Sequence, residues 1–339
     1  LFKNYYSKKF SQNQSFCGFD LDYTIIKTKS GRVFPKSSQD WTWLYPEVPK
    51  KLKQLNKENK LIIIISNQKG ISMNKTKSQD IYDKIEMIYQ KLKIPFVFTA
   101  ATHDDKLRKP RTGIIKKINK KLKIKLLVNN SFYVGDAAGR DKDRNDSDRK
   151  FAYNLKVKFF TPEEYFLDQP IDSQPWKYKG YDITNHQFES LIPKTNASII
   201  MLSGYPGSGK SESAKNYFPN HLHLSGDENK SKLGKLILQN INNNIVIEGL
   251  FYKKSQRKKV IDIAKKNKKK ITLIHLDVPI NLAQHLNTYR QMKTNKKIST
   301  VVYRVYDKYY EPPELSEGFE QILYLKPEYS KRLFTRFLL

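Results

Sequence analysis

The sequence lacks several features that would place it in common protein classes. Its 339 residues include one cysteine, Cys17, which excludes an internal disulfide framework and fits a reducing compartment. The longest uninterrupted apolar run, residues 61–65, is far too short to cross a bilayer. No charged-then-apolar leader precedes Cys17, so we expect no signal peptide. Together these absences predict an intracellular protein without a membrane-spanning segment.

Acidic residues are also scarce. The chain has 63 Lys and Arg against 33 Asp and Glu, a formal net charge of +30, and such an excess favours polyanionic partners. Lysine runs such as residues 253–270 are more often solvated helix faces than binding surfaces, so the charge supports nucleic acid as a partner without establishing it. Hydrophobic residues make up 38% of the chain, enough for buried cores, and the length suggests two domains.

Short apolar runs alternate with helical patterns in both halves of the chain, which predicts parallel sheets. We expect strands at residues 16–21, 60–66, 96–99, 131–135, 198–203, 221–224, 244–248 and 271–277. We expect helices at residues 47–59, 78–91, 113–122, 148–154, 210–217 and 253–266. The predicted fold class is therefore α/β, with two tandem three-layer domains.

The expected domain boundaries follow from where this alternation stops. Between the two halves this alternation is absent, and the sequence contains Pro, Asp, Ser, Gly and isolated aromatic residues instead. We predict an N-terminal extension at 1–15, a first domain at 16–168, a linker at 169–195 and a second domain at 196–339.

The second domain contains a phosphate-binding loop. Residues 204–211 read GYPGSGKS and fit G-x-x-x-x-G-K-[ST], between an apolar run and a helical pattern. Glycines let backbone N–H groups converge on phosphate oxygens, and the helix N-terminus adds a favourable field. Lys210 would reach the β- and γ-phosphates, and the Ser211 hydroxyl would ligate Mg²⁺. The residues expected to bind ATP are Gly204, Gly207, Ser208, Gly209, Lys210 and Ser211.

Two further residues are candidates for this second site. Asp227 follows an apolar run, where a carboxylate can accept the proton of an attacking hydroxyl. An Asp after a strand is more often a cap or turn residue, however. Arg290 lies in a helix-like stretch and could stabilise a transferred phosphate, although an isolated arginine of this kind is typical of a protein surface.

The first domain carries two carboxylates, Asp20 and Asp22, directly after an apolar run. At a strand end the chain turns, so one carboxylate can be a nucleophile while the other transfers protons. An aspartate nucleophile forms an aspartyl-phosphate, which splits phosphate hydrolysis into two easier steps. Because like charges this close repel each other, Mg²⁺ is implied.

Three residues further along complete this pattern. Ser66 ends an expected strand, where its hydroxyl could bind a phosphate oxygen. Lys109 could neutralise the nucleophile and the phosphoryl group, and Asp136 follows another expected strand and could complete the Mg²⁺ site. In this order, the elements match the plan of haloacid-dehalogenase-type phosphatases.

The match extends to a narrower family. The segments GFDLDYTII, THDDKLRKPRTG and YVGDAAGRDKDRNDSDRKFAYN resemble the phosphatase domain of polynucleotide kinase 3′-phosphatases. GYPGSGKSES and RVYDKYYEPPELSEGFEQI are similar to their kinase domain. The resemblance implies a haloacid-dehalogenase-like (Rossmann-like) 3′-phosphatase domain followed by a P-loop 5′-polynucleotide kinase domain. This order is that of the cellular enzymes rather than the phage enzyme.

The same resemblance implies roles for individual residues. In the phosphatase, Asp20 would be the nucleophile and Asp22 the general acid and base, with Ser66 and Lys109 holding phosphate. In the kinase, Asp227 would activate a 5′-hydroxyl and Arg290 would stabilise the phosphate transferred from ATP. Mg²⁺ would be bound in both sites, and the implied metal ligands are Asp20, Asp22, Asp136, Asp143 and Ser211.

The sequence departs from the family pattern in the kinase half. The family usually has an Arg before its catalytic Asp, where this chain has Gly226. Its D-N-T-N segment appears here as EGLF, in which Glu248 could keep the carboxylate role but Leu250 has no hydroxyl. Acceptor binding is therefore less firmly implied than ATP binding. The residues before the first strand leave no room for a forkhead-associated domain, so we expect no docking through one.

We expect a bifunctional enzyme that removes 3′-phosphates, adds 5′-phosphates with ATP, and so prepares DNA strand breaks for a ligase. Two alternatives stay open. The same chemistry could act on RNA ends, or a 3′-phosphatase could carry a degenerate kinase half that serves as an end-binding adaptor. We expect a monomer, nuclear if it is a eukaryotic cellular protein and otherwise in the cytoplasm or a viral factory.

Overall fold

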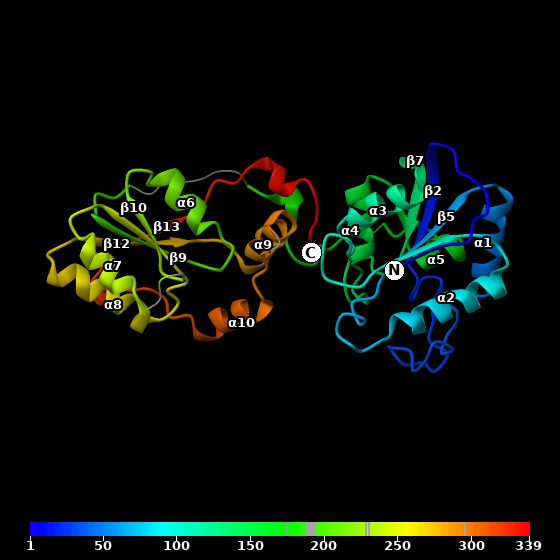
Figure 1. Cartoon of the computed structure of the whole chain (residues 1–339), viewed down its shortest axis with the longest axis horizontal. Helices are drawn as coiled ribbons and strands as arrows, with labels where there is room; N and C mark the ends of the chain where they lie inside the picture. The colour runs from blue at the N-terminus through cyan, green and yellow to red at the C-terminus, as the bar shows by residue number, and fades with distance from the viewer. Residues whose placement is uncertain (174, 188–193, 228, 230, 295) are drawn as a thin grey trace. The chain divides into compact units, whose positions relative to one another are not determined.

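The computed structural model describes residues 1–173, 175–187, 194–227, 229, 231–294 and 296–339. The chain divides into two compact units, one formed by Leu1–Asp182 with Arg336–Leu339 and the other by Ile183–Thr335. The predicted linker, residues 169–195, spans the division at 182/183, and its residues 174 and 188–193 lie outside the described residues. Each unit has an α/β fold (Figure 1).

The first unit is built on a six-stranded sheet with the order β1-β6-β5-β2-β7-β8. Its strands are β1 (Phe2–Asn4), β2 (Asn13–Phe19), β5 (Leu61–Asn67), β6 (Val97–Ala101), β7 (Lys125–Val134) and β8 (Lys158–Phe160). Neighbouring strands are parallel except for β1, which is antiparallel to β6. A separate hairpin pairs β3 (Ile26–Lys27) with β4 (Thr42–Trp43).

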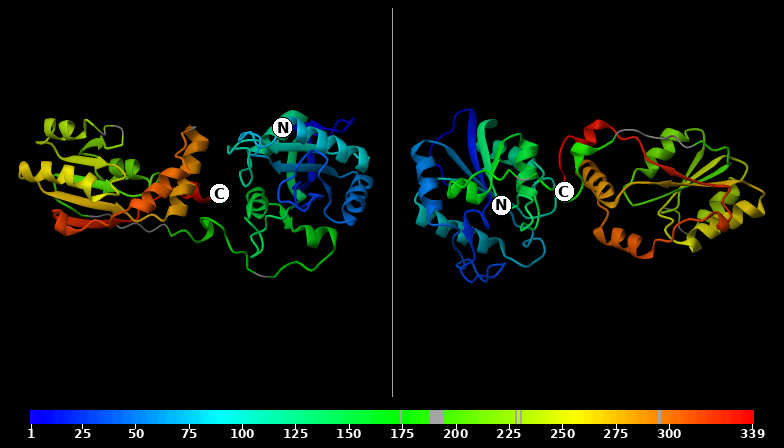
Figure 2. Two further views of the ribbon diagram at one scale, coloured as in Figure 1. Left: turned by 90° about the horizontal axis from the view of Figure 1, so that it is seen from below. Right: turned by 180° about the vertical axis from the view of Figure 1, so that it is seen from behind.

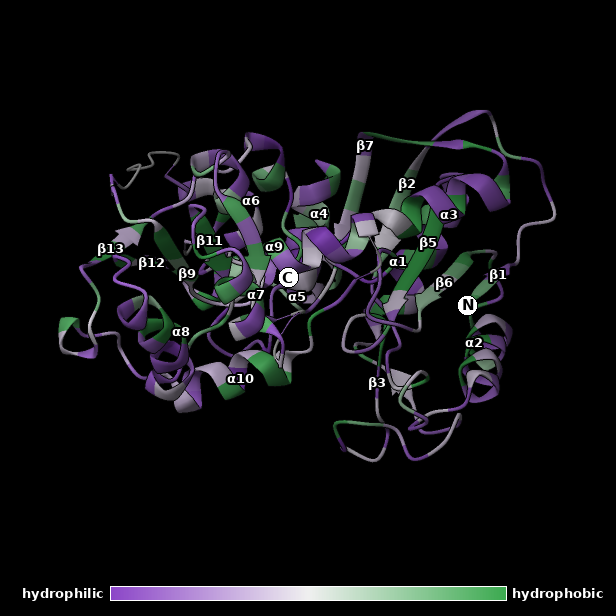
Figure 3. Ribbon diagram, turned by 60° about the vertical axis from the view of Figure 1, so that its left-hand side comes forward, coloured by the Kyte–Doolittle hydropathy of each residue, from purple (hydrophilic) through white to green (hydrophobic). Residues whose placement is uncertain are grey.

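Helices cover both faces of this sheet. They are α1 (Glu47–Lys57), α2 (Ser78–Leu92), α3 (Gly113–Leu122), α4 (Ser147–Leu155) and α5 (Pro162–Phe166). Within β5, Ile62 and Ile64 belong to the core shared with α1 and α2, whereas Ile63 and Ile65 belong to the core shared with α3 and α4. A parallel strand covered on both faces reads as a continuous apolar run, which is how β5 is coloured in Figure 3.

The second unit has a five-stranded parallel sheet with the order β10-β11-β9-β12-β13. Its strands are β9 (Ile199–Ser203), β10 (Leu222–Ser225), β11 (Ile245–Glu248), β12 (Ile271–Leu276) and β13 (Gln321–Leu325). Its helices are α6 (Lys210–Tyr217), α7 (Leu233–Gln239), α8 (Lys254–Lys266), α9 (Ile280–Thr294) and α10 (Thr300–Tyr309) (Figure 2). Ile237 of α7 and Val260 of α8 share a buried cluster with the sheet.

The parallel strands of both sheets place several candidate functional residues at their carboxyl ends, where α/β proteins bind ligands. Asp20 follows β2, and Asp136 follows β7. The phosphate-binding loop joins β9 to α6, and Asp227 follows β10. The predicted α/β fold class is confirmed. No helix among the described residues is both long and apolar enough to cross a membrane.

Candidate active sites

Three carboxylates meet at the carboxyl edge of the first sheet. One oxygen from each of Asp20, Asp136 and Asp148 lies within 4.8 Å of the others. Burial, followed by the charges of Asp148 and Asp20, raises the pKa of Asp136 to about 8. Burial is also the main cause that raises the pKa of Asp148 to about 6. Such mutual repulsion is relieved when a divalent cation binds, and an all-oxygen ligand set suits Mg²⁺.

The Lys109 side chain places a positive charge beside two of these carboxylates. Its ammonium, with a side chain only 2% exposed, lies 2.7 Å from Asp20 Oδ1 and 2.7 Å from Asp148 Oδ1. It also donates a 2.8 Å hydrogen bond to the Tyr133 hydroxyl. Burial lowers the pKa of Lys109, but the Asp148 and Asp20 carboxylates outweigh that effect and raise it. Burial raises the pKa of Asp20, and Lys109 opposes this shift. Lys109 therefore helps to hold the Asp20 carboxylate in its charged form.

The backbone that carries Lys109 is held by Asn67 at the end of β5. The Lys109 N–H donates to Asn67 Oδ1 at 3.0 Å, and Asn67 Nδ2 donates back to the Lys109 carbonyl at 3.2 Å. This reciprocal pair fixes the peptide from which the ammonium extends.

Asp22 lies in the turn after Asp20 and lines the same pocket. The N–H groups of residues 24, 25 and 26 all point to the Leu21 carbonyl. Gln68 Nε2 donates to Asp22 Oδ2 at 2.7 Å and to Ser66 Oγ at 2.8 Å. Gln68 therefore links the predicted proton-transfer residue to the predicted phosphate-binding hydroxyl.

Asp143, a predicted metal ligand, lies outside the group of three carboxylates but lines a neighbouring pocket with Asp136. Its carboxylate pairs with Arg140 Nε at 2.9 Å and accepts the N–H groups of Ala138 and Arg140. The acidic group found among the described residues contains Asp148 instead. The structure thus gives Asp143 a turn-stabilising environment, and the third carboxylate of the group comes from the first turn of α4.

Three residues of this site were not predicted from the sequence: Asp148 and Arg108, which line the pocket, and Tyr133, which contacts Lys109. Asp148 had a usable signal, since it starts the helix expected at 148–154. Arg108 lines the same pocket as Asp20 and Lys109, and its Nη1 is buried without a hydrogen-bond partner among the described residues. A buried, unpaired guanidinium nitrogen is costly unless a ligand satisfies it, which makes Arg108 a candidate for an anion.

The phosphate-binding loop of the second unit has the backbone that its glycines permit. Gly204, Gly207 and Gly209 have φ of +140°, +82° and +96°, which L-residues with a Cβ rarely adopt. Lys210 Nζ donates to the carbonyls of Gly204 and Tyr205 at 2.9 and 2.7 Å. Burial lowers its pKa to about 8, although Asp227 and Glu248 oppose the shift.

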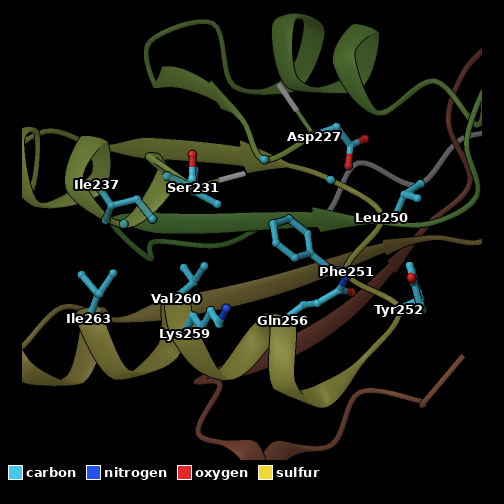
Figure 4. A pocket seen from close by; sticks show the side chains of 14 residues that line it. Asp227, Ser231, Ile237, Leu250, Phe251, Tyr252, Gln256, Lys259, Val260 and Ile263 are labelled. Atoms are coloured by element: carbon cyan, nitrogen blue, oxygen red, sulfur yellow. The ribbon is translucent and has the colours of Figure 1, made fainter. Parts of the chain in front are cut away.

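The other kinase candidates lie around this loop. Ser211 Oγ donates a 2.6 Å hydrogen bond to Glu248 Oε2, so Glu248 reaches the predicted metal-binding hydroxyl. Arg290, on α9, contributes to lowering the Lys210 pKa, which places its charge near that lysine. Asp227 and Leu250 line a cavity of about 580 Å³ (Figure 4). The structure therefore brings Lys210, Ser211 and Glu248 together, with Asp227 in the adjacent cavity.

Both units are similar to known proteins. The family described as "Polynucleotide kinase 3 phosphatase" matches residues 15–166. The chain is 35% identical over 330 residues to a "Bifunctional polynucleotide phosphatase/kinase" of Schizosaccharomyces pombe, covering 93% of this chain and 80% of that protein. It is 28% identical to a "Putative bifunctional polynucleotide phosphatase/kinase" of Acanthamoeba polyphaga mimivirus, covering 90% and 82%. A "Polynucleotide 3'-phosphatase" of Saccharomyces cerevisiae is 32% identical over 204 residues, covering 44% of this chain and 85% of that protein.

Proposed function

This chain belongs to the bifunctional polynucleotide phosphatase/kinase family, and from that premise we propose that it heals nucleic-acid ends. It removes 3′-phosphates and phosphorylates 5′-hydroxyls with ATP, so that broken DNA strands can be ligated. The observation that carries the proposal is the presence, in one chain, of the acidic group around Lys109 and of the phosphate-binding loop around Lys210.

In the phosphatase, an Asp20 oxygen attacks the phosphorus of the 3′-phosphate and the bond from phosphorus to the 3′-oxygen breaks. Asp22 gives a proton to the departing 3′-oxygen, then removes one from the water that attacks the phosphorus of the aspartyl-phosphate. The second step releases inorganic phosphate and regenerates Asp20. The hydrogen bond from Gln68 to Asp22, at 2.7 Å, orients the proton-transfer carboxyl.

Several cationic and polar groups would hold the phosphate during these steps. Lys109 lies against Asp20, so it would also face the transferred group. The unpaired nitrogen of Arg108 and the Ser66 hydroxyl are further donors at the same edge of the sheet. Asp20, Asp136 and Asp148 would hold Mg²⁺, which supplies positive charge that offsets the repulsion between the phosphate and the carboxylates.

In the kinase, the loop N–H groups and Lys210 would bind the phosphates of ATP, and Ser211 with Glu248 would hold Mg²⁺. When phosphate arrives, the Lys210 ammonium exchanges its carbonyl partners at Gly204 and Tyr205 for phosphate oxygens. Asp227 would accept the proton of the attacking 5′-hydroxyl, and Arg290 would stabilise the transferred phosphoryl group.

The proposal extends to the setting of the reaction. A ligase acts on the product ends, because a 3′-hydroxyl beside a 5′-phosphate is what ligation requires. The protein works as a monomer in a reducing compartment inside the cell, the nucleus if the cell is eukaryotic. The buried free thiol of Cys17 is compatible with that compartment.

The third carboxylate can be identified by two matched substitutions. Asp148→Asn should lower 3′-phosphatase turnover at least about 100-fold, because it removes a carboxylate from both Lys109 and the metal site. Asp143→Asn should leave turnover near the wild-type rate, since Asp143 contacts Arg140 rather than the acidic group. Both rates are measured on a 3′-phosphorylated oligonucleotide at saturating Mg²⁺. A loss confined to Asp143→Asn would reinstate Asp143 as the ligand.

The choice between DNA and RNA is open to direct comparison. We expect higher kcat/KM on DNA ends than on RNA ends of matched sequence, for both activities. The measurement uses one enzyme preparation and paired oligonucleotides carrying a 3′-phosphate or a 5′-hydroxyl. A clear preference for RNA ends would favour RNA repair. Absence of transfer from γ-labelled ATP to any 5′-hydroxyl would favour the alternative of a phosphatase with a degenerate kinase half.

A further inference from the structure

A short segment that follows the kinase unit in sequence belongs to the phosphatase unit in space. Arg336–Leu339 group with Leu1–Asp182, although more than 150 residues separate them along the chain. Phe337 and Leu338 are 0% and 4% exposed. Two neighbouring residues this deeply buried make the segment part of the interior of the unit. We refer to Phe337, Leu338 and Leu339 as the 337–339 segment.

The ring of Phe337 lies in an aromatic cage. Its centroid is 5.1 Å from that of Tyr153, 5.3 Å from Trp176 and 5.2 Å from Tyr178. The Lys150 ammonium lies 5.3 Å from the centre of the same ring. Aromatic and cation–π contacts of this kind favour one orientation of the ring beyond simple burial.

Three buried polar side chains hold the backbone of the segment. Asn154 accepts the Phe337 N–H at 2.8 Å and donates to the Phe337 carbonyl at 2.6 Å. Arg111 Nε donates to the Leu338 carbonyl at 3.1 Å, and Lys150 Nζ to a carbonyl oxygen of Leu339 at 2.8 Å. Because all of these side chains are buried, loss of the segment would leave each of them with an unsatisfied group.

Those same side chains connect the segment to the phosphatase pocket. Asn154 also donates to the carbonyl of Pro110, the residue after Lys109, at 2.9 Å. It lies on α4, the helix that carries Asp148. Leu339 itself lines the pocket that contains Asp20 and Lys109. The segment therefore touches both parts of the chain that supply the Lys109–Asp148 ion pair.

We propose that the 337–339 segment is a positioning element of the phosphatase: through Asn154 and Arg111 it fixes the 109–111 backbone against α4, and so places the Lys109 ammonium between Asp20 and Asp148. Asn67 holds the Lys109 peptide from β5, and the segment holds the two residues that follow. The inference rests on the proposed phosphatase function. On this proposal, phosphatase activity depends on residues that follow the kinase unit in sequence.

The test compares three single variants of the full chain. Phe337→Ala empties the aromatic cage, and the nearly isosteric Asn154→Asp replaces the donor to Phe337 and Pro110 by a carboxylate oxygen. Arg336→Ala is the matched control, since the exposed Arg336 side chain donates its one hydrogen bond within the described part of the chain to Thr112 Oγ1. Each variant is assayed for 3′-phosphatase kcat and KM, for 5′-kinase rate, and for thermal unfolding.

We expect Phe337→Ala and Asn154→Asp to lower phosphatase kcat about 10- to 100-fold with little change in KM, since a displaced catalytic group slows chemistry more than it weakens binding. The kinase rate and the Arg336→Ala phosphatase rate should stay near wild type. A double variant that combines Phe337→Ala with Asn154→Asp should lose little more phosphatase kcat than either single variant, because both substitutions act through one contact.

Phosphatase kcat that stays at the wild-type value in folded Phe337→Ala and Asn154→Asp would overturn the proposal. An increase in KM with unchanged kcat would also overturn it, because the segment would then contribute to substrate binding rather than to positioning. If Phe337→Ala does not fold, Asn154→Asp decides alone. A wild-type protein without phosphatase activity would instead refute the proposed function, so the two failures are distinguishable.

Discussion

Asp20→Asn should abolish 3′-phosphate removal, with a loss of at least about 10,000-fold in kcat. The amide has nearly the shape of the carboxylate but cannot form the aspartyl-phosphate. It also removes one of the two charges that face the Lys109 ammonium. Turnover is measured as inorganic phosphate released from a 3′-phosphorylated duplex under single-turnover conditions.

The kinase activity of the same Asp20→Asn preparation is the internal control. Asp20 belongs to the first unit and the phosphate-binding loop to the second, so the 5′-kinase rate should stay close to wild type. Phosphatase activity that survives in Asp20→Asn would remove Asp20 from the nucleophilic role.

Lys210→Ala should produce the opposite pattern. We expect the 5′-kinase rate to fall about 100- to 1,000-fold, because in the proposed kinase this side chain would supply the positive charge that faces the β- and γ-phosphates. This ammonium is buried and donates to the carbonyls of Gly204 and Tyr205, partners that it would exchange for phosphate oxygens. The rate is measured as transfer of labelled γ-phosphate to a 5′-hydroxyl oligonucleotide.

Lys215→Ala is a suitable companion for Lys210→Ala. Lys215 is an exposed lysine of the same helix, α6, and its removal should leave transfer unchanged. A comparable loss in both variants would mean that general positive charge, rather than the loop lysine, drives the reaction.

The sequence predicted helices and strands most accurately where the residues of the segment itself determine its conformation. Residues 113–122 and 210–217 were predicted as helices and form α3 and α6 with the same bounds. β1, β8 and β13 were not predicted, although each pairs with a strand that was. β1 and β8 have three residues each, too few to show a local pattern, and depend on pairing with strands far away in sequence. β13 reads QILYL, whose β-forming residues were a usable signal.

In the phosphatase site, too, some residues could be identified from the sequence and others could not. Asp20 and Lys109 were chosen for their chemistry, and the fold brings them to 2.7 Å. The third carboxylate was harder, because the stretch around residues 141–148 offers several aspartates and only the turn into α4 decides that Asp148 faces Lys109. Tyr133 fell within a predicted strand, where nothing local marked it as functional; its ring is buried, and its hydroxyl accepts a hydrogen bond from Lys109.

The central claim, that one chain heals both sides of a break at separate sites, is tested most directly on a nicked DNA duplex with a 3′-phosphate facing a 5′-hydroxyl. With ATP and Mg²⁺, the wild-type protein should convert both ends, and added DNA ligase should then seal the nick. Asp20→Asn should yield only the new 5′-phosphate, and Lys210→Ala only the new 3′-hydroxyl. Conversion of a single end by the wild-type protein, or loss of both conversions from either substitution, would contradict the account.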